Sequence, residues 1–464
     1  MALFNPYNEN RNLDHIPGEY GAPIVGQSLR LLKDPQAVTR EYYNKYGPVY
    51  KLKAFGRRSV ALVGPEANEM VLMDREKNFS SKGGWDPILD KLFPRGLMLR
   101  DFDDHRKHRR IMQAAFKASA MKAYVDALNE GIAHGLSKWD KERDFEFYPA
   151  IKDLTLHTAA SVFLGIPLGP EADRLNKAFV DSVQASVAVL RVPIPGTKFW
   201  RGIKGRNYIV KYFGEQIPLR RGSDKQDMFT LLCNATDDDG NSFTDDEIID
   251  HMDFLMMAAH DTLTSSISTL IYHLSQNKEW QENLRNECRS LNLPSPHELP
   301  YESLGDLQMV EWAFKEALRI NPPVPSIPRR TVRDVEFGGY VIPANTPVTI
   351  SPGFVHKMEE LWTNPKEFEP DRFSEQRAED RSHKYAWVPF GGGAHMCIGL
   401  HFAYMQMKVF MYQLLMQYEV FTDPGYKADF QIMPIPKPKD GLPVHIRPLG
   451  ENVETPDTHK EAAE

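Results

Sequence analysis

The chain has 464 residues, of which 42% are hydrophobic and 26% are charged, a composition typical of a soluble globular protein with a large core. Its 56 Lys and Arg residues against 63 Asp and Glu residues give a net charge of −7, which argues against a nucleic-acid-binding protein. Three cysteines are too few for a disulfide framework or a multi-cysteine zinc site and indicate a reducing compartment: Cys233, Cys288 and Cys397.

The beginning of the chain predicts a small β region without a membrane anchor. It contains no apolar run with the length of a signal peptide or a spanning helix, so we expect a cytoplasmic protein. A stretch rich in Pro and Gly is followed by two alternating runs at residues 49–53 and 59–63, with Phe55-Gly56 between them. This pattern predicts a β-hairpin, and we assign residues 15–65 to a β region.

Residues 66–320 read as a helical core that contains one long helix. Thr244 and Glu247 have the spacing of a capping box, which marks the start of that helix. No Pro or Gly interrupts the chain from there to about Gln276. The middle of the helix, residues 254–259, is apolar almost all round and predicts burial. The polar residues 260–262 follow directly, and buried polar groups need partners or a function.

The C-terminal part returns to short β-prone runs and ends in a further helix. The runs lie within residues 330–350 and are broken by Gly338-Gly339, so this segment joins the small β region. Residues 351–420 are expected to be helical, with a last helix over residues 399–417, and residues 432–436 to form a loop or strand turn. The polar residues 451–464 predict a flexible tail. Without repeats or a linker, the chain reads as one mostly α domain with a minor β part over residues 1–464.

A cysteine ringed by glycines carries the clearest chemical pattern in the sequence. It lies in the segment Phe390-Gly391-Gly392-Gly393-Ala394-His395-Met396-Cys397-Ile398-Gly399, just before the last predicted helix. Glycines allow positive φ and a close approach to a flat ligand, and N–H groups near a helix start can hold a thiolate. A lone cysteine is more often a small buried hydrophobe, but the residues around this one favour a binding function.

This segment resembles the heme-binding signature of the cytochrome P-450 superfamily, Phe-x-x-Gly-x-(Arg/His)-x-Cys-x-Gly. Its fixed places are filled by Phe390, Gly393, His395, Cys397 and Gly399. The resemblance implies heme b (iron protoporphyrin IX) between the long helix and this loop, with the Cys397 thiolate as the iron ligand. It also implies that Phe390 shields the sulfur and that His395 donates to a heme propionate.

A Glu-x-x-Arg motif and a later arginine agree with the same family. Glu316 and Arg319 share a helix face, and alone they would read as a solvated surface pair. Arg372 lies in the segment Phe368-Glu369-Pro370-Asp371-Arg372-Phe373. The resemblance implies a buried network of Glu316, Arg319 and Arg372 that braces the heme-binding loop and has a structural role.

The polar residues of the long helix match the family's oxygen-side motif. The segment Ala258-Ala259-His260-Asp261-Thr262 differs from the commoner pattern at Ala259, where Gly is usual. The resemblance implies that Thr262 delivers protons to dioxygen and that Asp261 feeds this relay. Thr262 could instead bond back to the carbonyl one turn earlier, a common habit of Thr within helices. His260 remains open between a packed polar residue and a helper in the proton path.

Basic residues in two further segments resemble the family's propionate ligands. His105 and Arg109 stand four residues apart on a predicted helix, and Arg329 is the third candidate, with Arg330 as an alternative one residue on. Charge-assisted contacts to carboxylates suit these side chains. The other basic residues of the 105–110 run read as a solvated helix face, which in this family often meets an acidic redox partner.

The resemblance covers roughly residues 16–448 and implies a heme-thiolate monooxygenase. It would hydroxylate a hydrophobic small molecule, a steroid, terpenoid or fatty lipid, as a monomer fed with NAD(P)H electrons by a ferredoxin or flavodoxin-type partner. The motifs lie nearer the sterol- and retinoid-oxidising branches, while the missing anchor resembles soluble bacterial members. The apolar residues expected to line the substrate pocket, each of which could equally be core, are Trp85, Ile88, Leu89, Leu97, Met98, Phe254, Leu255, Ala258, Val324, Ile327, Ile432 and Met433.

Two alternatives to the monooxygenase reading stay open. One keeps the fold and uses peroxide as a peroxygenase, or acts as an isomerase or dehydratase without a reductase. The other is a heme-binding sensor or carrier without turnover. The Asp261–Thr262 pair argues against the first, and thiolate ligation beside that pair argues against the second.

Overall fold

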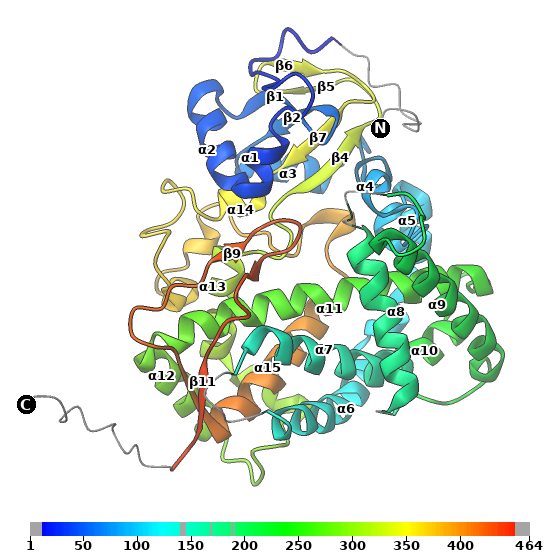
Figure 1. Cartoon of the computed structure of the whole chain (residues 1–464), viewed down its shortest axis with the longest axis vertical. Helices are drawn as coiled ribbons and strands as arrows, with labels where there is room; N and C mark the ends of the chain where they lie inside the picture. Colours follow the sequence, from blue (N-terminus) through cyan, green and yellow to red (C-terminus); the bar gives the residue numbers. More distant parts are fainter. Residues whose placement is uncertain (1–11, 140–144, 168, 187, 189–190, 451–464) are drawn as a thin grey trace, which may run out of the picture.

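The computed structural model describes residues 12–450 except 140–144, 168, 187, 189 and 190. It consists of a smaller lobe that holds most of the strands, called here the β lobe, and a larger helical part crossed by one long helix, α11 (Figure 1). The structure is predominantly helical with small sheets, as the sequence predicts. The tail expected over residues 451–464 lies outside the described residues.

The β lobe is built on a five-stranded sheet in the order β1-β2-β7-β4-β3. The hairpin expected near residue 55 is present, with β1 and β2 antiparallel and in the register Val49↔Leu62. β2 pairs in parallel with β7, so that Val60 faces Val348 from far along the chain. The strands and helices of this lobe are β1 (Val49–Ala54), β2 (Arg57–Leu62), β3 (Phe79–Ser80), β4 (Ile327–Thr331), β5 (Val335–Phe337), β6 (Tyr340–Ile342), β7 (Pro347–Ile350), α1 (Ser28–Lys33), α2 (Pro35–Tyr46) and α3 (Pro65–Met73).

The remaining helices supply most of the mass of the molecule (Figure 1). They are α4 (Ser81–Leu89), α5 (Phe102–Met112), α6 (Ala118–Ser137), α7 (Phe147–Leu164), α8 (Pro170–Ser186), α9 (Lys198–Arg220), α10 (Met228–Asn234), α11 (Asp245–Ser275), α12 (Lys278–Ser290), α13 (Gln308–Ile320), α14 (Pro352–Val355) and α15 (Leu400–Gln417). Short 3₁₀ helices occupy Leu97–Leu99, Gln113–Phe116, Tyr301–Asp306, Pro370–Phe373, Glu379–Arg381 and Gly393–His395.

The helix α11 has the start and length that the sequence predicts. The Thr244 side chain accepts a hydrogen bond from the Glu247 backbone N–H, and the Glu247 carboxylate accepts one from the Thr244 N–H, which completes the capping box. Gln276 caps the other end. The helix packs against α7, α9 and α13. Because its middle is enclosed on several sides, the polar residues there, including His260 and Asp261, are buried.

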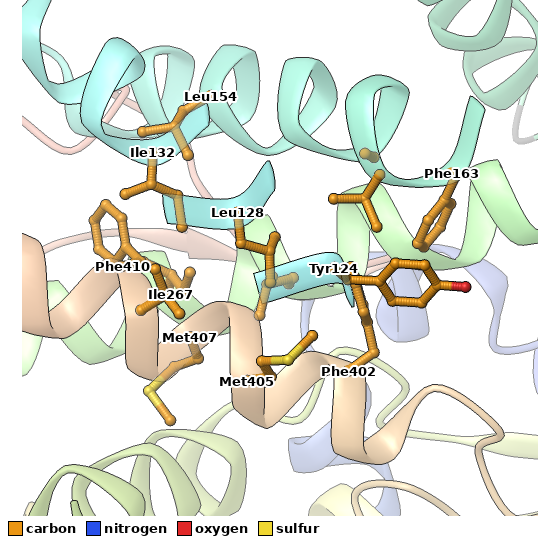
Figure 2. Packing of buried hydrophobic residues seen from close by; sticks show 14 of the residues in the cluster. Tyr124, Leu128, Ile132, Leu154, Phe163, Ile267, Phe402, Met405, Met407 and Phe410 are labelled. Atoms are coloured by element: carbon orange, nitrogen blue, oxygen red, sulfur yellow. The ribbon is translucent and has the colours of Figure 1, made fainter. Parts of the chain in front are cut away.

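The main core lies where α6, α7, α11 and α15 meet, and Figure 2 shows their apolar side chains interdigitating. Each fully buried Leu, Ile or Phe contributes roughly 1.5–3 kcal/mol, so this contact fixes α15 against α11. The labelled residues of that contact are Tyr124, Leu128, Ile132, Leu154, Phe163, Ile267, Phe402, Met405, Met407 and Phe410.

The C-terminal segment ends in two short strand pairs. β8 (Tyr418–Phe421) pairs with β11 (His445–Pro448), and β9 (Phe430–Gln431) pairs with β10 (Lys437–Pro438). The loop expected at residues 432–436 connects β9 with β10. Among the helices of the described residues, none has the length and apolarity that crossing a bilayer would require.

Candidate active site

The cysteine loop is fixed by backbone contacts that tolerate only glycine at one position. Gly393 has φ +60°, and a Cβ at this residue would lie 2.0 Å from the Leu72 carbonyl oxygen on α3. The Cys397 N–H donates to the Phe390 carbonyl at 2.9 Å and closes the loop. The Phe390 ring packs against Tyr404 on α15, with centroids 5.6 Å apart. The loop is therefore held between α3 and α15.

Cys397 differs from the other two cysteines in its exposure. Cys233 and Cys288 are buried, and burial raises the pKa of each thiol to about 12, so both stay protonated at neutral pH. Cys397 is exposed, although the protein around it raises its pKa through burial, opposed by a hydrogen bond from Gly399 and by the charge of Arg109. Of the three cysteines, Cys397 is therefore the one whose thiol is accessible to a ligand.

Two histidines and two arginines gather beside this loop. The His105 and His395 rings lie 3.8 Å apart, and Arg109 donates to the Met396 carbonyl at 2.7 Å. Arg329 is buried and donates to the adjacent Pro328 carbonyl at 2.9 Å. Within the part of the chain that the structure describes, neither Arg109 nor Arg329 has a carboxylate within ion-pair distance.

These groups have the chemistry that two heme propionates require. His105 is buried, and its Nε2 atom has no hydrogen-bond partner among the described residues. Burial lowers the pKa of His105 to about 4 and that of His395 to about 2, with neighbouring positive charges adding to the effect, and burial lowers the pKa of Arg329 to about 10. A nearby carboxylate would raise the pKa of each of these three side chains again. Their chemistry therefore fits the propionates of the heme that the cysteine motif implies.

Arg330, the alternative to Arg329, points to the β lobe instead. Its guanidinium donates to the Gly83 carbonyl at 3.3 Å and to the Asn345 carbonyl at 3.0 Å. It therefore joins α4 to the sheet, which leaves Arg329 as the better candidate for a propionate ligand.

On α11 the three polar residues have clear partners. The Thr262 hydroxyl donates to the Ala258 carbonyl at 2.8 Å, which is the back-bond considered from sequence. The Asp261 carboxylate lies 3.1 Å from the Lys152 ammonium on α7 and 3.2 Å from His260 Nδ1. His260 is buried, burial lowers its pKa, and its Nε2 atom has no hydrogen-bond partner among the described residues.

Lys152 is the residue that sequence reasoning missed at this site. A single lysine on a helix 109 positions from its partner carries no local pattern, and only the packing of α7 against α11 brings the two together. The ammonium contacts the carboxylate that the sequence assigns to proton transfer, so it bears directly on the position of that group.

The Glu316–Arg319–Arg372 network has the buried geometry that the sequence comparison implied. Arg319 donates to the Glu316 carboxylate through Nε at 2.7 Å and a terminal nitrogen at 2.8 Å. Arg372 donates to the same carboxylate at 3.0 Å and pairs with Glu379 at 2.7 Å. All three side chains of the network are fully buried. It ties α13 to the segment that precedes the cysteine loop.

The structure brings together only part of the predicted substrate pocket. One apolar cluster contains Trp85, Leu89, Met98, Phe254 and Ala258, together with residues of α8 and α9. The other seven candidates lie elsewhere: Leu97 and Leu255 in the main core, Val324 and Ile327 in the β lobe, Ile88 exposed, and Ile432 and Met433 half-buried in the loop between β9 and β10.

Comparisons with known proteins agree with this geometry. The family model described as "Cytochrome P450" matches residues 16–440. "Putative cytochrome P450 136" of Mycobacterium tuberculosis is 37% identical over 442 residues, covering 94% of this chain and 89% of that protein. Taxane 10-beta-hydroxylase of Taxus cuspidata is 27% identical over 97% of this chain and 93% of its own. A solved structure, "Retinoic acid bound cyanobacterial CYP120A1", superposes with a TM-score of 0.83 at 27% identity, over 94% of this chain and 99% of that one.

Proposed function

The chain belongs to the cytochrome P450 family and is a heme-thiolate monooxygenase in its general activity, and from that premise we propose that it hydroxylates a hydrophobic small molecule of the steroid, terpenoid or fatty lipid class. One observation carries the substrate class. The apolar cluster around Trp85, Leu89, Met98, Phe254 and Ala258 shares its helix α11 with Asp261 and Thr262. The names of two similar proteins, with a taxane and with retinoic acid, indicate isoprenoid skeletons and support the same class.

We assign the heme ligands to residues that the structure gathers around the cysteine loop. Cys397 would hold the iron, and His105, Arg109, Arg329 and His395 would hold the propionates. Phe390, Gly393 and Gly399 would shape the loop. When bound, the heme supplies oxygen activation, which thiolate ligation favours by donating electron density.

The protein's own part in the reaction is to position substrate and to move protons. The apolar cluster orients the substrate and excludes water from it. Lys152 holds the Asp261 carboxylate in place through a contact of 3.1 Å. The Thr262 hydroxyl is oriented by its bond to the Ala258 carbonyl, which leaves its lone pairs free to accept a proton-carrying water. Consecutive side chains on a helix do not face each other, so a proton delivered at Asp261 would reach Thr262 through water.

The electrons would come from NAD(P)H through a separate ferredoxin or flavodoxin-type protein, and the expected working form is a monomer in the cytoplasm. Because family members without reductases use the same fold, the test must separate the activities. Product formed with NADPH, surrogate ferredoxin and its reductase supports the proposal. Product formed only with hydrogen peroxide, or without any oxidant, would point to the peroxygenase or the isomerase and dehydratase alternatives.

Ligation by Cys397 is tested by spectroscopy of the ferrous–CO complex. Cys397→Ser is expected to lose the long-wavelength Soret band, since serine offers no thiolate. The matched control is the double replacement Cys233→Ser and Cys288→Ser, which should keep the band because both thiols are buried and protonated. A full thiolate spectrum in Cys397→Ser would overturn the assignment. A binding-spectrum screen of sterols, terpenoids and fatty acids then identifies the substrate class.

A further inference from the structure

One buried carboxyl group on α11 has no part in the chemistry described above. Asp253 is 1% exposed, and neither of its side-chain oxygens has a hydrogen-bond partner among the described residues. Arg206 on α9 faces it, but the Arg206 Nε atom lies 3.9 Å from the nearer carboxyl oxygen, beyond hydrogen-bond distance. A buried polar group without partners is costly, so this position is one where a ligand can supply the missing bonds.

Asp253 lies at one end of the apolar cluster proposed to hold the substrate. On α11 it shares a face with Met257, which packs against that cluster. On α9, Arg206 shares a face with Ile203, which packs against the same cluster. The Arg206 Nε atom near Asp253 also donates to the carbonyl of Leu92, a buried member of the cluster, at 3.0 Å. The cluster is therefore apolar along its length and polar at this end.

The chemistry of this polar end favours a neutral group that both donates and accepts. Arg206 reaches Asp250 at 3.5 Å, and Asp250 pairs with Arg95 at 2.6 Å. An ammonium group cannot accept a hydrogen bond from Arg206, and a carboxylate cannot donate one to Asp253. A hydroxyl group does both, in either protonation state of Asp253, and adds no charge to the buried site.

We propose that Asp253 and Arg206 bind a hydroxyl group at one end of an otherwise apolar substrate. This inference rests on the proposed function, since the apolar cluster holds the rest of the molecule. Asp253 precedes Thr262 by nine residues, which is about 13.5 Å along a helix. The bound hydroxyl thus places a carbon roughly 13 Å away beside the residue assigned to proton delivery. The substrate is an elongated alcohol that is oxidised far from its hydroxyl group.

The test compares alcohols with hydrocarbons of the same skeleton on the full-length, heme-loaded protein. The probes are cholestanol with cholestane and hexadecanol with hexadecane, and the dissociation constants are read from the spectral shift that substrate binding causes. In at least one pair the alcohol should bind about tenfold or more tightly, as expected for a hydrogen bond to a charged group. Because this comparison uses the parent protein, it does not depend on the folding of a variant.

Two substitutions assign the preference to the carboxyl group. Asp253→Leu should abolish it, so that an alcohol and its hydrocarbon bind within about twofold of each other, and should broaden the set of oxidised positions found by mass spectrometry. Asp253→Asn is the matched control and should keep most of the preference, because its amide also accepts from and donates to a hydroxyl group. Both variants should carry as much heme as the parent.

The outcomes separate this inference from the proposed function. Equal affinities within both pairs, or an unchanged preference in Asp253→Leu, would overturn the hydroxyl site, while product formed from the hydrocarbons with NADPH, surrogate ferredoxin and its reductase would leave the monooxygenase proposal standing. Tighter binding of palmitic acid than of hexadecanol would overturn it in favour of a carboxylate site. No spectral shift with any probe would overturn the hydroxyl site together with the proposed substrate class.

Discussion

The Thr262 hydroxyl makes a hydrogen bond within α11 and is also the group proposed to take part in proton transfer. Its proton is donated to the Ala258 carbonyl at 2.8 Å, so toward any further partner the oxygen acts as an acceptor. The adjacent Asp261 is held by Lys152 across the α7–α11 contact. The back-bond and the relay, which compete when read from sequence, are therefore compatible in space.

Thr262→Ala is expected to separate electron use from product formation. Substrate binding should persist, while the ratio of product to NADPH consumed falls by about tenfold or more and hydrogen peroxide accumulates. Stability should change by less than about 1 kcal/mol, because the lost bond is local. Thr262→Ser is the control and should keep most of the coupling. A lowered melting temperature with unchanged coupling would assign Thr262 to packing alone.

Asp253 is a buried carboxyl of α11 with no hydrogen-bond partner on either oxygen among the described residues. Arg206 approaches it only to 3.9 Å, and burial raises its pKa well above the usual 3.8. The folded state therefore favours the protonated form. The resulting stabilisation is fully present below about pH 4 and is lost as pH rises through the folded-state pKa.

Asp253→Asn should remove this pH dependence. We expect the free energy of unfolding to rise by about 1–3 kcal/mol at neutral pH and to vary less between pH 4 and neutrality, as measured by denaturant unfolding across that range. The control is Asp239→Asn, at an exposed loop position. In this variant the free energy of unfolding should vary with pH as it does in the parent. An unchanged slope in Asp253→Asn would show that the carboxyl is charged in the folded protein.

At the scale of elements, the cysteine loop depends on its contact with α3. The loop backbone approaches Leu72 so closely that a Cβ on Gly393 would overlap the Leu72 carbonyl oxygen, at 2.0 Å. Since that obstacle is backbone, it cannot rotate aside. The glycine of the heme signature thus has a steric reason in this chain.

Gly393→Ala is expected to displace the loop and to lower the heme content of purified protein severalfold, because both the clash and the positive φ oppose the native backbone. Heme per chain is measured from the pyridine hemochromogen spectrum. Gly56→Ala is a control with positive φ but no atom within 4 Å of the added Cβ; it should lose some stability and keep its heme. Normal loading of Gly393→Ala would exclude the steric explanation.

Elements marked by local sequence could be predicted, and contacts between distant segments could not. The capping box and the uninterrupted run after it define α11 to within a residue at both ends, and the β1–β2 hairpin follows from alternation around Phe55-Gly56. Lys152 has no such mark, because its role arises from packing with a residue 109 positions away. Most of the predicted pocket residues do not lie together for the same reason. In the sequence, an apolar residue that lines a site cannot be told from one that fills the core.

At the scale of the molecule, the Glu316–Arg319–Arg372 network joins α13 to the segment leading into the cysteine loop. Arg319 also donates to the carbonyls of His356 and Pro365 at 2.9 and 2.8 Å. It also donates to the Glu367 carbonyl at 3.1 Å. Loss of this one fully buried side chain would therefore remove a donor from the Glu316 carboxylate and from three backbone carbonyls.

Arg319→Ala is expected to cost about 3–5 kcal/mol, a large share of the 5–15 kcal/mol typical of a whole protein. Most of the variant should therefore be recovered without heme or in aggregates, as measured by soluble yield and heme content. Arg319→Lys should recover little, since one ammonium cannot replace the paired donors. Well-folded Arg319→Ala with a normal melting temperature would show that the network contributes little.

The parallel pairing of β2 with β7 has a consequence for how the chain is made. Leu62 and Ile350 are partners but are separated by roughly 290 residues, which a ribosome adds in about 15–60 s. During that interval β2 is paired with β1 on one side, while the edge that later pairs with β7 has no partner strand. An unpaired strand edge is a template for association with other chains. Nascent chains that have not yet reached β7 should therefore be the species that chaperones hold, and closure of the β lobe is a late, nearly post-translational event.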